Sequence, residues 1–213
     1  KNMLSYGGSV YVEVPDTTRF ARCLDAPFQQ FSVEHINFFS VISLANLMQS
    51  NDFIQVFCQQ DAREQSHDTM MPVISAIFRK EGPRSLSPVR DVETEQGLAK
   101  YICQSQQVDD HIRQTIDNIV VSDRPIIVWG VGTHTLRLLA TSRLKEANIC
   151  VFVDSNPKYQ GKQLNGIPII APTNLKDRSE PILISSRVFQ QDIKRQIRDE
   201  LKCNNELILL YQV

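Results

Sequence analysis

A glutamate and a histidine stand side by side in a segment rich in aromatic residues. Glu34 and His35 lie within residues 31–40, which we expect to form a loop between a strand and a helix. Loops after the carboxyl ends of strands are where α/β sheets place their active sites. A histidine titrates near neutral pH and can act as a general base, and a nearby carboxylate can tune its pKa. On these two residues alone, a structural or solvated role is the alternative.

Two glycines separated by one residue follow a strongly apolar run in the second half of the chain. Gly130 and Gly132 come after residues 125–129 and precede a helical pattern. Amides at a helix N-terminus attract phosphate, so Gly132, Thr133 and His134 are candidate ligands for a diphosphate. A tight turn between a strand and a helix uses the same glycines, and the dinucleotide motif lacks its third glycine. Both roles stay open.

An aspartate ends the next apolar run, about 20 residues after the glycines, where a carboxylate can accept a hydrogen bond from a ribose hydroxyl. Asp154 occupies this position. Taken alone, Gly130, Gly132 and Asp154 also permit an NAD-linked enzyme.

The elements that position these residues differ between the two halves of the chain. In the first half we expect a strand at 9–14 and a helix that Ser40 caps and that ends near Asn51. Two β-favouring runs at 53–58 and 72–78, separated by a polar segment, predict adjacent antiparallel strands.

Apolar and helical patterns alternate in the second half, after a region broken by prolines and glycine. A proline-free stretch at 91–121 predicts one long helix, or two joined. Alternation of strand and helix implies a parallel sheet with helices on its faces. The expected strands are 125–129, 149–153, 167–170, 182–185 and 207–210, with helical runs after residue 132, up to 147, and at 190–202.

The fold class expected from these patterns is α/β. We expect three parts, which are residues 1–80 as a first unit, 81–121 as a linker and connecting helix, and 122–213 as a second domain.

Charge and apolar patterning exclude several classes of partner. The formal net charge is −1, from 23 basic and 24 acidic residues, so no field exists to hold a nucleic acid. The apolar runs are far shorter than the roughly 20 residues of a membrane span. The 5 cysteines are far apart and fit neither a disulfide framework nor a closed zinc site. We expect a cytoplasmic protein without a metal site.

Segments in both halves resemble one enzyme family. Residues 7–16 look like the fifth strand of class I methyltransferases, and residues 34–40, followed by Leu44, Leu47 and Asp52, resemble the link to the next helix and strand. In the second half, residues 129–132, 154–161 and 166–169 are similar to the C-terminal domain of sugar C-methyltransferases. The resemblance covers nearly the whole chain and implies a partial methyltransferase sheet followed by a Rossmann-like domain.

The resemblance also implies an activity and roles for residues. It implies S-adenosylmethionine-dependent C-methylation of a nucleotide-linked keto sugar. His35 is then the base that removes a proton from the carbon to be methylated, with Glu34 as its partner and Asn37 as a substrate contact. No glycine-rich cofactor turn precedes Gly7, so we expect the S-adenosylmethionine site to lie mostly outside these residues. A non-catalytic module that binds a nucleotide or nucleotide-sugar is the alternative.

Overall fold

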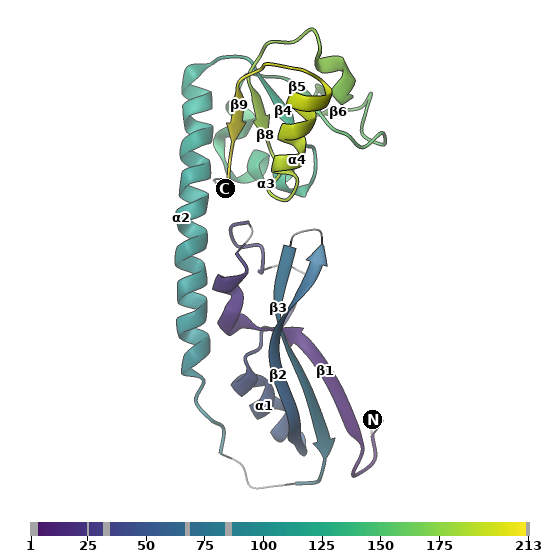
Figure 1. Cartoon of the computed structure of the whole chain (residues 1–213). Coiled ribbons are helices and arrows are strands. Elements are labelled where there is room, and N and C mark those ends of the chain that lie inside the picture. Colours follow the sequence, from purple (N-terminus) through teal and green to yellow (C-terminus); the bar gives the residue numbers. More distant parts are fainter. Residues whose placement is uncertain (1–3, 25, 32–34, 67–68, 84–86, 212–213) are drawn as a thin grey trace. The chain divides into compact units, whose positions relative to one another are not determined.

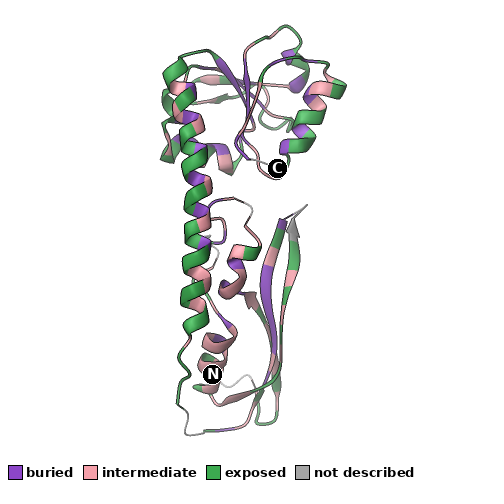
Figure 2. Cartoon of the chain, turned by 60° about the vertical axis from the view of Figure 1, so that its left-hand side comes forward, coloured by how far each residue is buried: buried purple, intermediate pink, exposed green. Residues whose placement is uncertain are grey.

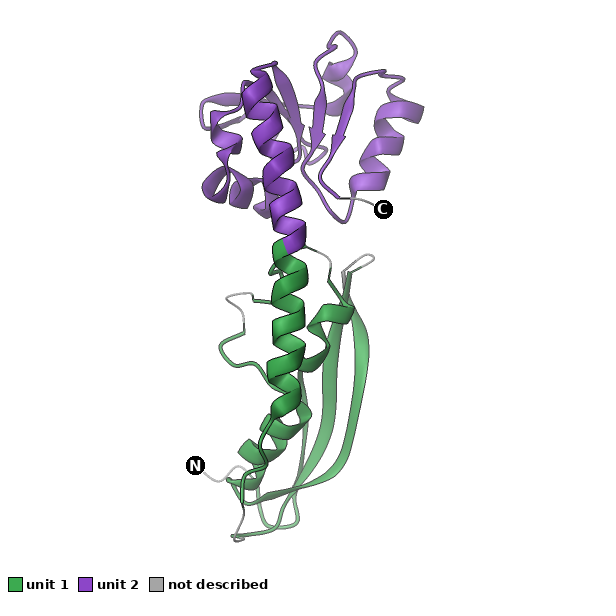
Figure 3. Ribbon diagram, turned by 90° about the vertical axis from the view of Figure 1, so that its left-hand side faces the viewer, with its two compact units in different colours: residues 1–106 green, residues 107–213 purple. Residues whose placement is uncertain are grey.

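The chain forms two compact units, residues Lys1–Gln106 and Gln107–Val213, in a computed structural model (Figures 1 and 3). The structure describes residues 4–24, 26–31, 35–66, 69–83 and 87–211. The division falls inside the long helix α2 (Val92–Ser122), so of the two possibilities expected over 91–121, one long helix or two joined, the structure has the single helix. The boundaries expected at 80 and 122 coincide instead with the ends of a strand and of this helix.

The first unit is built on an antiparallel sheet of three strands in the order β1-β3-β2 (Figure 1). The strand expected at 9–14 and the helix expected after Ser40 are both confirmed. The elements before α2 are β1 (Ser9–Pro15), the 3-10 helix η1 (Thr17–Arg22), α1 (Val41–Gln49), β2 (Phe53–Ser66) and β3 (Thr69–Lys80).

The hairpin of β2 and β3 is longer than the sequence predicts. The polar residues after Cys58 were expected to separate the strands, but they continue β2, and Gln60 pairs with Ile74 of β3. Exposed positions of a strand take polar residues, so the sequence after Cys58 resembles that of a loop. The prediction of antiparallel pairing is correct, and the predicted strand ends are wrong.

Helix α1 packs its apolar side on the three-stranded sheet. Ser40 caps it, because its hydroxyl accepts a hydrogen bond from the Ser43 amide at 2.9 Å while the Ser43 hydroxyl accepts one from the Ser40 amide at 2.8 Å. Leu44 is buried in one cluster with Ile74 and Phe78 of β3. This cluster is the core of the sheet's helix-covered face.

The second unit contains a sheet of six strands in the order β6-β7-β5-β4-β8-β9. All neighbouring pairs are parallel except β6 with β7, an antiparallel edge pair too short to be read from the sequence. The elements are β4 (Ile126–Trp129), α3 (Thr133–Thr141), η2 (Arg143–Glu146), β5 (Ile149–Val153), β6 (Gln163–Leu164), β7 (Ile167–Ile170), η3 (Pro172–Leu175), β8 (Ile182–Ile184), α4 (Gln190–Arg195), the π-helical turn η4 (Gln196–Glu200) and β9 (Leu207–Leu209).

Two apolar clusters cover the two faces of this sheet. Figure 2 shows that the sheet's central strands are mostly buried. Strand β4 shows the division, because successive side chains of a strand point to opposite faces. Ile126 and Val128 join one cluster with residues of α2 and α3, whereas Ile127 and Trp129 join the other with residues of α4. Helices therefore lie on both faces, as the alternating pattern predicts.

The architecture as a whole is mixed α/β, with one antiparallel sheet and one sheet that is mostly parallel. Helix α2 is the longest helix in the described part of the chain. Neither it nor any other described helix has a stretch long and apolar enough to cross a membrane.

Candidate functional site

The candidate site of the second unit lies where the order of its sheet reverses. From β4 the chain passes through α3 to β5 on one side, and it later reaches β8 on the other side of β4. Crevices at the carboxyl ends of strands at such a switch point are the usual ligand sites of open α/β sheets. The turn of residues 130–134 follows β4 at this place, and Ser185 follows β8.

The two glycines of this turn have different roles. Gly130 has φ +107°, and a Cβ there would lie 3.0 Å from the Ser185 carbonyl oxygen. Gly132 has φ −73°, which any residue adopts, and a Cβ there would meet no atom within 4 Å. Gly130 is therefore required by the turn itself, whereas Gly132 leaves open space at the start of α3.

Helix α3 begins without a side-chain cap. Gly132 is its N-cap residue, and the Leu136 amide donates to the Gly132 carbonyl at 3.1 Å. The amides of Gly132, Thr133 and His134 find no acceptor among the residues that the structure describes. Free amides and the helix dipole make such an end favourable for an anion.

Asp154 lies beside this turn, as expected, but its carboxylate is already engaged. One oxygen accepts from the Val131 amide at 2.9 Å, and the other accepts from the Asn156 amide at 2.8 Å. The side chain thus ties the end of β5 to the turn after β4. These bonds give it a structural role besides any contact with a ribose.

The imidazole of His134 lies in a polar cluster. Its Nδ1 lies 3.2 Å from the Ser185 hydroxyl, and its Nε2 lies 2.6 Å from the Tyr211 hydroxyl. The Thr135 hydroxyl is 2.8 Å from both the Ser185 hydroxyl and the Gly130 carbonyl oxygen. We call these four contacts, from Tyr211 to Gly130, the hydrogen-bond series.

The direction of the hydrogen-bond series follows from its last member. The Gly130 carbonyl only accepts, so the single hydroxyl proton of Thr135 goes to it. Ser185 must then donate to Thr135, and His134 must donate to Ser185 through Nδ1. A neutral imidazole has one N–H, so Nε2 accepts from Tyr211. Each hydroxyl donates once, and the tautomer of His134 is fixed.

The surroundings of His134 keep it neutral. Its pKa is lowered from 6.5 to about 4, mainly by burial and also by the nearby charge of Arg137, while a hydrogen bond to the backbone of Ser185 opposes the shift. Arg137 itself pairs with the buried Asp109 at 2.7 Å. The imidazole therefore stabilises the turn, and it does not offer a positive charge to a phosphate near pH 7.

The candidate residues of the first unit lie in a loop with aromatic ends. The rings of Phe31 and Phe38 are 5.7 Å apart, and both pack edge-on against the buried Phe20. His35, between them, is half-buried, and its imidazole has no hydrogen-bond partner among the described residues. The backbone between Phe31 and His35 lies outside the described residues, and Glu34 falls there.

Asn37 is exposed in the same loop. His35 and Asn37 belong to the first unit, and the other candidates belong to the second. The structure brings Gly130, Gly132, Thr133 and His134 together with Asp154 at one turn.

Sequence reasoning missed two members of the second-unit site. Ser185 carried one signal, because it is a polar residue directly after an apolar strand run. Tyr211 carried none, since it lies 77 residues from the histidine it contacts. Within the described residues, no cluster of three potential metal ligands is present.

Comparison with known proteins gives one result for the second unit. Residues 122–209 match the protein family described as C2185-like, N-terminal. The matched segment runs from the end of α2 to β9. No curated protein matches the chain. The chain is thus similar, over its second unit, to the C2185-like N-terminal family.

Proposed function

We propose that the second unit binds the phosphate-bearing part of a nucleotide-linked ligand at the start of α3. The observation that carries this proposal is the set of unpaired amides of Gly132, Thr133 and His134 at the switch point between β4 and β8. Gly132 adds no side chain in front of them. A diphosphate accepts several N–H donors at once and gains from the helix dipole.

We further propose that the chain is the C-terminal portion of an S-adenosylmethionine-dependent C-methyltransferase that acts on a nucleotide-linked keto sugar. The resemblance of residues 7–16 and 34–40 to that family supports this assignment. His35 would remove the proton from the carbon next to the keto group, and that carbon would then attack the methyl group. Glu34 and Asn37 would contact the base or the sugar.

A non-catalytic nucleotide or nucleotide-sugar binding module is the second candidate. The specific observation in its favour is that the imidazole of His35 has no orienting partner among the described residues. General bases are usually held by such a partner. By contrast, the free amides proposed to bind the nucleotide phosphate belong to the second unit.

Thermal unfolding with nucleoside diphosphates tests the binding proposal. Ligand stabilisation grows as RT ln(1 + [L]/Kd), so about 1 mM nucleotide gives about 1.4 kcal/mol at a Kd of about 100 μM. The variant Gly132→Val should remain folded, because φ at Gly132 suits any residue and the space beside it is open. It should lose the protection, since its side chain blocks the amides. No protection of the wild type, or equal protection of a folded Gly132→Val variant, would refute the site.

Calorimetric titration with S-adenosylmethionine tests the assignment of the cofactor. We expect no micromolar binding to these 213 residues, because the family's glycine-rich cofactor turn has no counterpart in them. Micromolar binding would show that the cofactor site lies within this chain. Methyl transfer itself is measured in the intact protein that the resemblance implies.

A further inference from the structure

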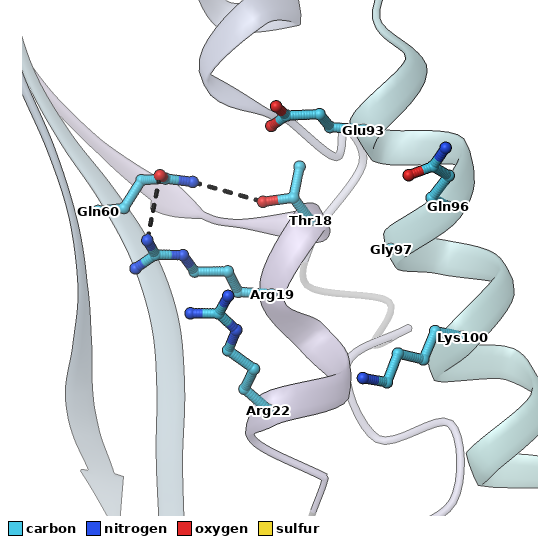
Figure 4. A pocket seen from close by; sticks show the side chains of 8 residues that line it. All are labelled: Thr18, Arg19, Arg22, Gln60, Glu93, Gln96, Gly97 and Lys100. Carbon is cyan, nitrogen blue, oxygen red and sulfur yellow. Dashed lines mark hydrogen bonds between the residues drawn. The ribbon is translucent and has the colours of Figure 1, made fainter.

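A basic cavity in the first unit shares no residue with either candidate site. Its volume is about 440 Å³. It is formed by one face of η1, a polar position of β2 and the first turns of α2 (Figure 4). The lining residues are Thr18, Arg19, Arg22, Gln60, Glu93, Gln96, Gly97 and Lys100.

A buried aspartate fixes one wall of this cavity. Asp16 accepts from the Thr18 hydroxyl at 2.6 Å and from the Gln60 amide at 2.7 Å, and it forms an ion pair with Arg19 at 3.7 Å. Arg19 also donates to the Gln60 side chain at 3.2 Å. These contacts hold the wall in one arrangement, and they compensate the charge of Arg19.

Two further cations on the lining are not compensated. Arg22 and Lys100 are both exposed, and neither has an ion-pair partner within the described part of the chain. Figure 4 shows Arg22 extended in the same direction as Arg19, while Lys100 reaches from α2 toward η1. Glu93 is the one carboxylate of the lining. The cavity therefore carries an excess of positive charge.

The contact between α2 and η1 is unusually close on one side of the cavity. A Cβ on Gly97 would lie 2.7 Å from the Thr18 carbonyl oxygen and 2.8 Å from its Cα. Only a glycine allows the two backbones to approach this far. The close contact sets the position of Lys100, one turn further along α2, relative to η1.

We infer that this cavity is a binding site for a small hydroxylated molecule that carries a phosphate group. Guanidinium groups bind phosphate oxygens in pairs of hydrogen bonds, and a dianion matches the two uncompensated cations Arg22 and Lys100. Gln96, Thr18 and Glu93 offer acceptors and donors for hydroxyl groups. The cavity is in the size range of small-molecule sites. This inference does not rest on the function proposed for the second unit.

Calorimetric titration of the 213-residue chain with glucose 1-phosphate tests the inference. We expect binding of glucose 1-phosphate, at least about tenfold weaker binding of gluconate, and no measurable binding of glucose. The double variant Arg22→Gln/Lys100→Gln should bind glucose 1-phosphate at least about tenfold more weakly than the wild type, because it loses both charged donors. The affinity of Arg22→Lys for glucose 1-phosphate should lie between those of the wild type and the double variant, because lysine keeps the positive charge but lacks the paired N–H donors of a guanidinium group.

Arg90→Gln is the matched control, because it removes the charge of another exposed arginine of the same unit outside the cavity. It should leave the affinity unchanged, as should Gly132→Val in the second unit. The inference is overturned by absence of binding at about 10 mM ligand, by an equal loss in Arg90→Gln, or by an unchanged affinity in the double variant. Binding of gluconate as tight as that of glucose 1-phosphate would overturn the preference for phosphate.

Discussion

The hydroxyl of Tyr211 donates a hydrogen bond to Nε2 of His134 at 2.6 Å. Because the rest of the hydrogen-bond series uses the Nδ1 proton of His134, this contact completes the bonding of a neutral imidazole. The two residues are 77 positions apart in the sequence, and their contact stabilises the turn after β4.

Loss of the tyrosine hydroxyl should leave a buried acceptor without a partner. We expect Tyr211→Phe to destabilise the second unit by about 1–3 kcal/mol, the usual cost of an unsatisfied buried polar group. Urea unfolding followed by the fluorescence of Trp129, the single tryptophan and a buried residue of this unit, measures the change. Tyr159→Phe is the control, because Tyr159 is exposed and should tolerate the same change.

The stability of the second unit should fall between about pH 6.5 and pH 4. The pKa of His134 is lowered from 6.5 to about 4 in the folded protein, so the unfolded chain takes up the proton first as the pH falls. The stabilising contribution is fully present above pH 6.5, and about 3 kcal/mol of it is lost by pH 4. The free energy of unfolding is measured across this pH range for the wild type and for His134→Gln. The difference between the two at each pH gives the contribution of His134, because all other groups titrate in both proteins.

His111→Gln provides the comparison for this pH dependence. His111 is exposed on α2 and lies outside the hydrogen-bond series, so this variant controls for the exchange of a histidine for a glutamine. Parallel curves of stability against pH for the wild type and His134→Gln would contradict the assigned neutral histidine.

The two glycines of the β4–α3 turn should respond differently to alanine. Gly130→Ala places a side chain at φ +107° and against the Ser185 carbonyl, and we expect a loss of about 2 kcal/mol or more. Gly132→Ala meets open space and should cost less than about 1 kcal/mol. Urea unfolding followed by the fluorescence of Trp129 measures the free energy of unfolding of both variants. Equal losses would mean that Gly132 also has a role in the turn.

Replacement of Gly97 should destabilise the first unit although it improves helix propensity. Alanine gains about 1 kcal/mol over glycine inside a helix, but a Cβ at 2.7 Å from the Thr18 carbonyl forces two backbones apart, at a cost of about 1–3 kcal/mol. Amide hydrogen exchange in η1 and the first turns of α2 should quicken in Gly97→Ala, with exchange in β4 and β5 unchanged. Slower exchange near η1 would show that the contact relaxes easily.

Replacement of the proposed base should slow methyl transfer in the intact protein that the family resemblance implies. We expect His35→Asn to reduce the rate by roughly 10²–10⁴-fold, the contribution of a positioned base, with unchanged affinity for S-adenosylmethionine. His67→Asn serves as the control, because His67 lies outside residues 7–16 and 34–40, which resemble the family in this half of the chain. Wild-type turnover in His35→Asn would leave His35 with a structural role only.

Much of the second unit could be predicted from sequence because its central strands are buried on both faces. Residues 126–129 and 149–153 form short apolar runs that are typical of a parallel sheet covered on both sides. The far half of β2 could not be predicted in this way, since an exposed strand face resembles a polar loop. Strand β6 has two residues, which is too short for any periodic pattern.

The candidate site shows the same division between local and distant signals. The glycine turn, the helix start and Asp154 were predicted from local spacing. The difference between Gly130 and Gly132 depends on φ and on the carbonyl of Ser185, 55 residues further along the chain, and no local pattern carries that information. The basic cavity joins residues from three separate segments, so it also becomes visible only in the folded chain.

The 77-residue separation between His134 and Tyr211 also determines when the turn can be completed. A polypeptide emerges from the ribosome in order, so β4 and the start of α3 are made long before the tyrosine that stabilises them. Contacts between distant residues form late because loop closure costs entropy. We expect pulsed hydrogen exchange during refolding to protect the strands of the sheet before the amides of Val131 and Leu136, which donate to Asp154 and Gly132. The proposed anion site would thus be the last part of the second unit to mature.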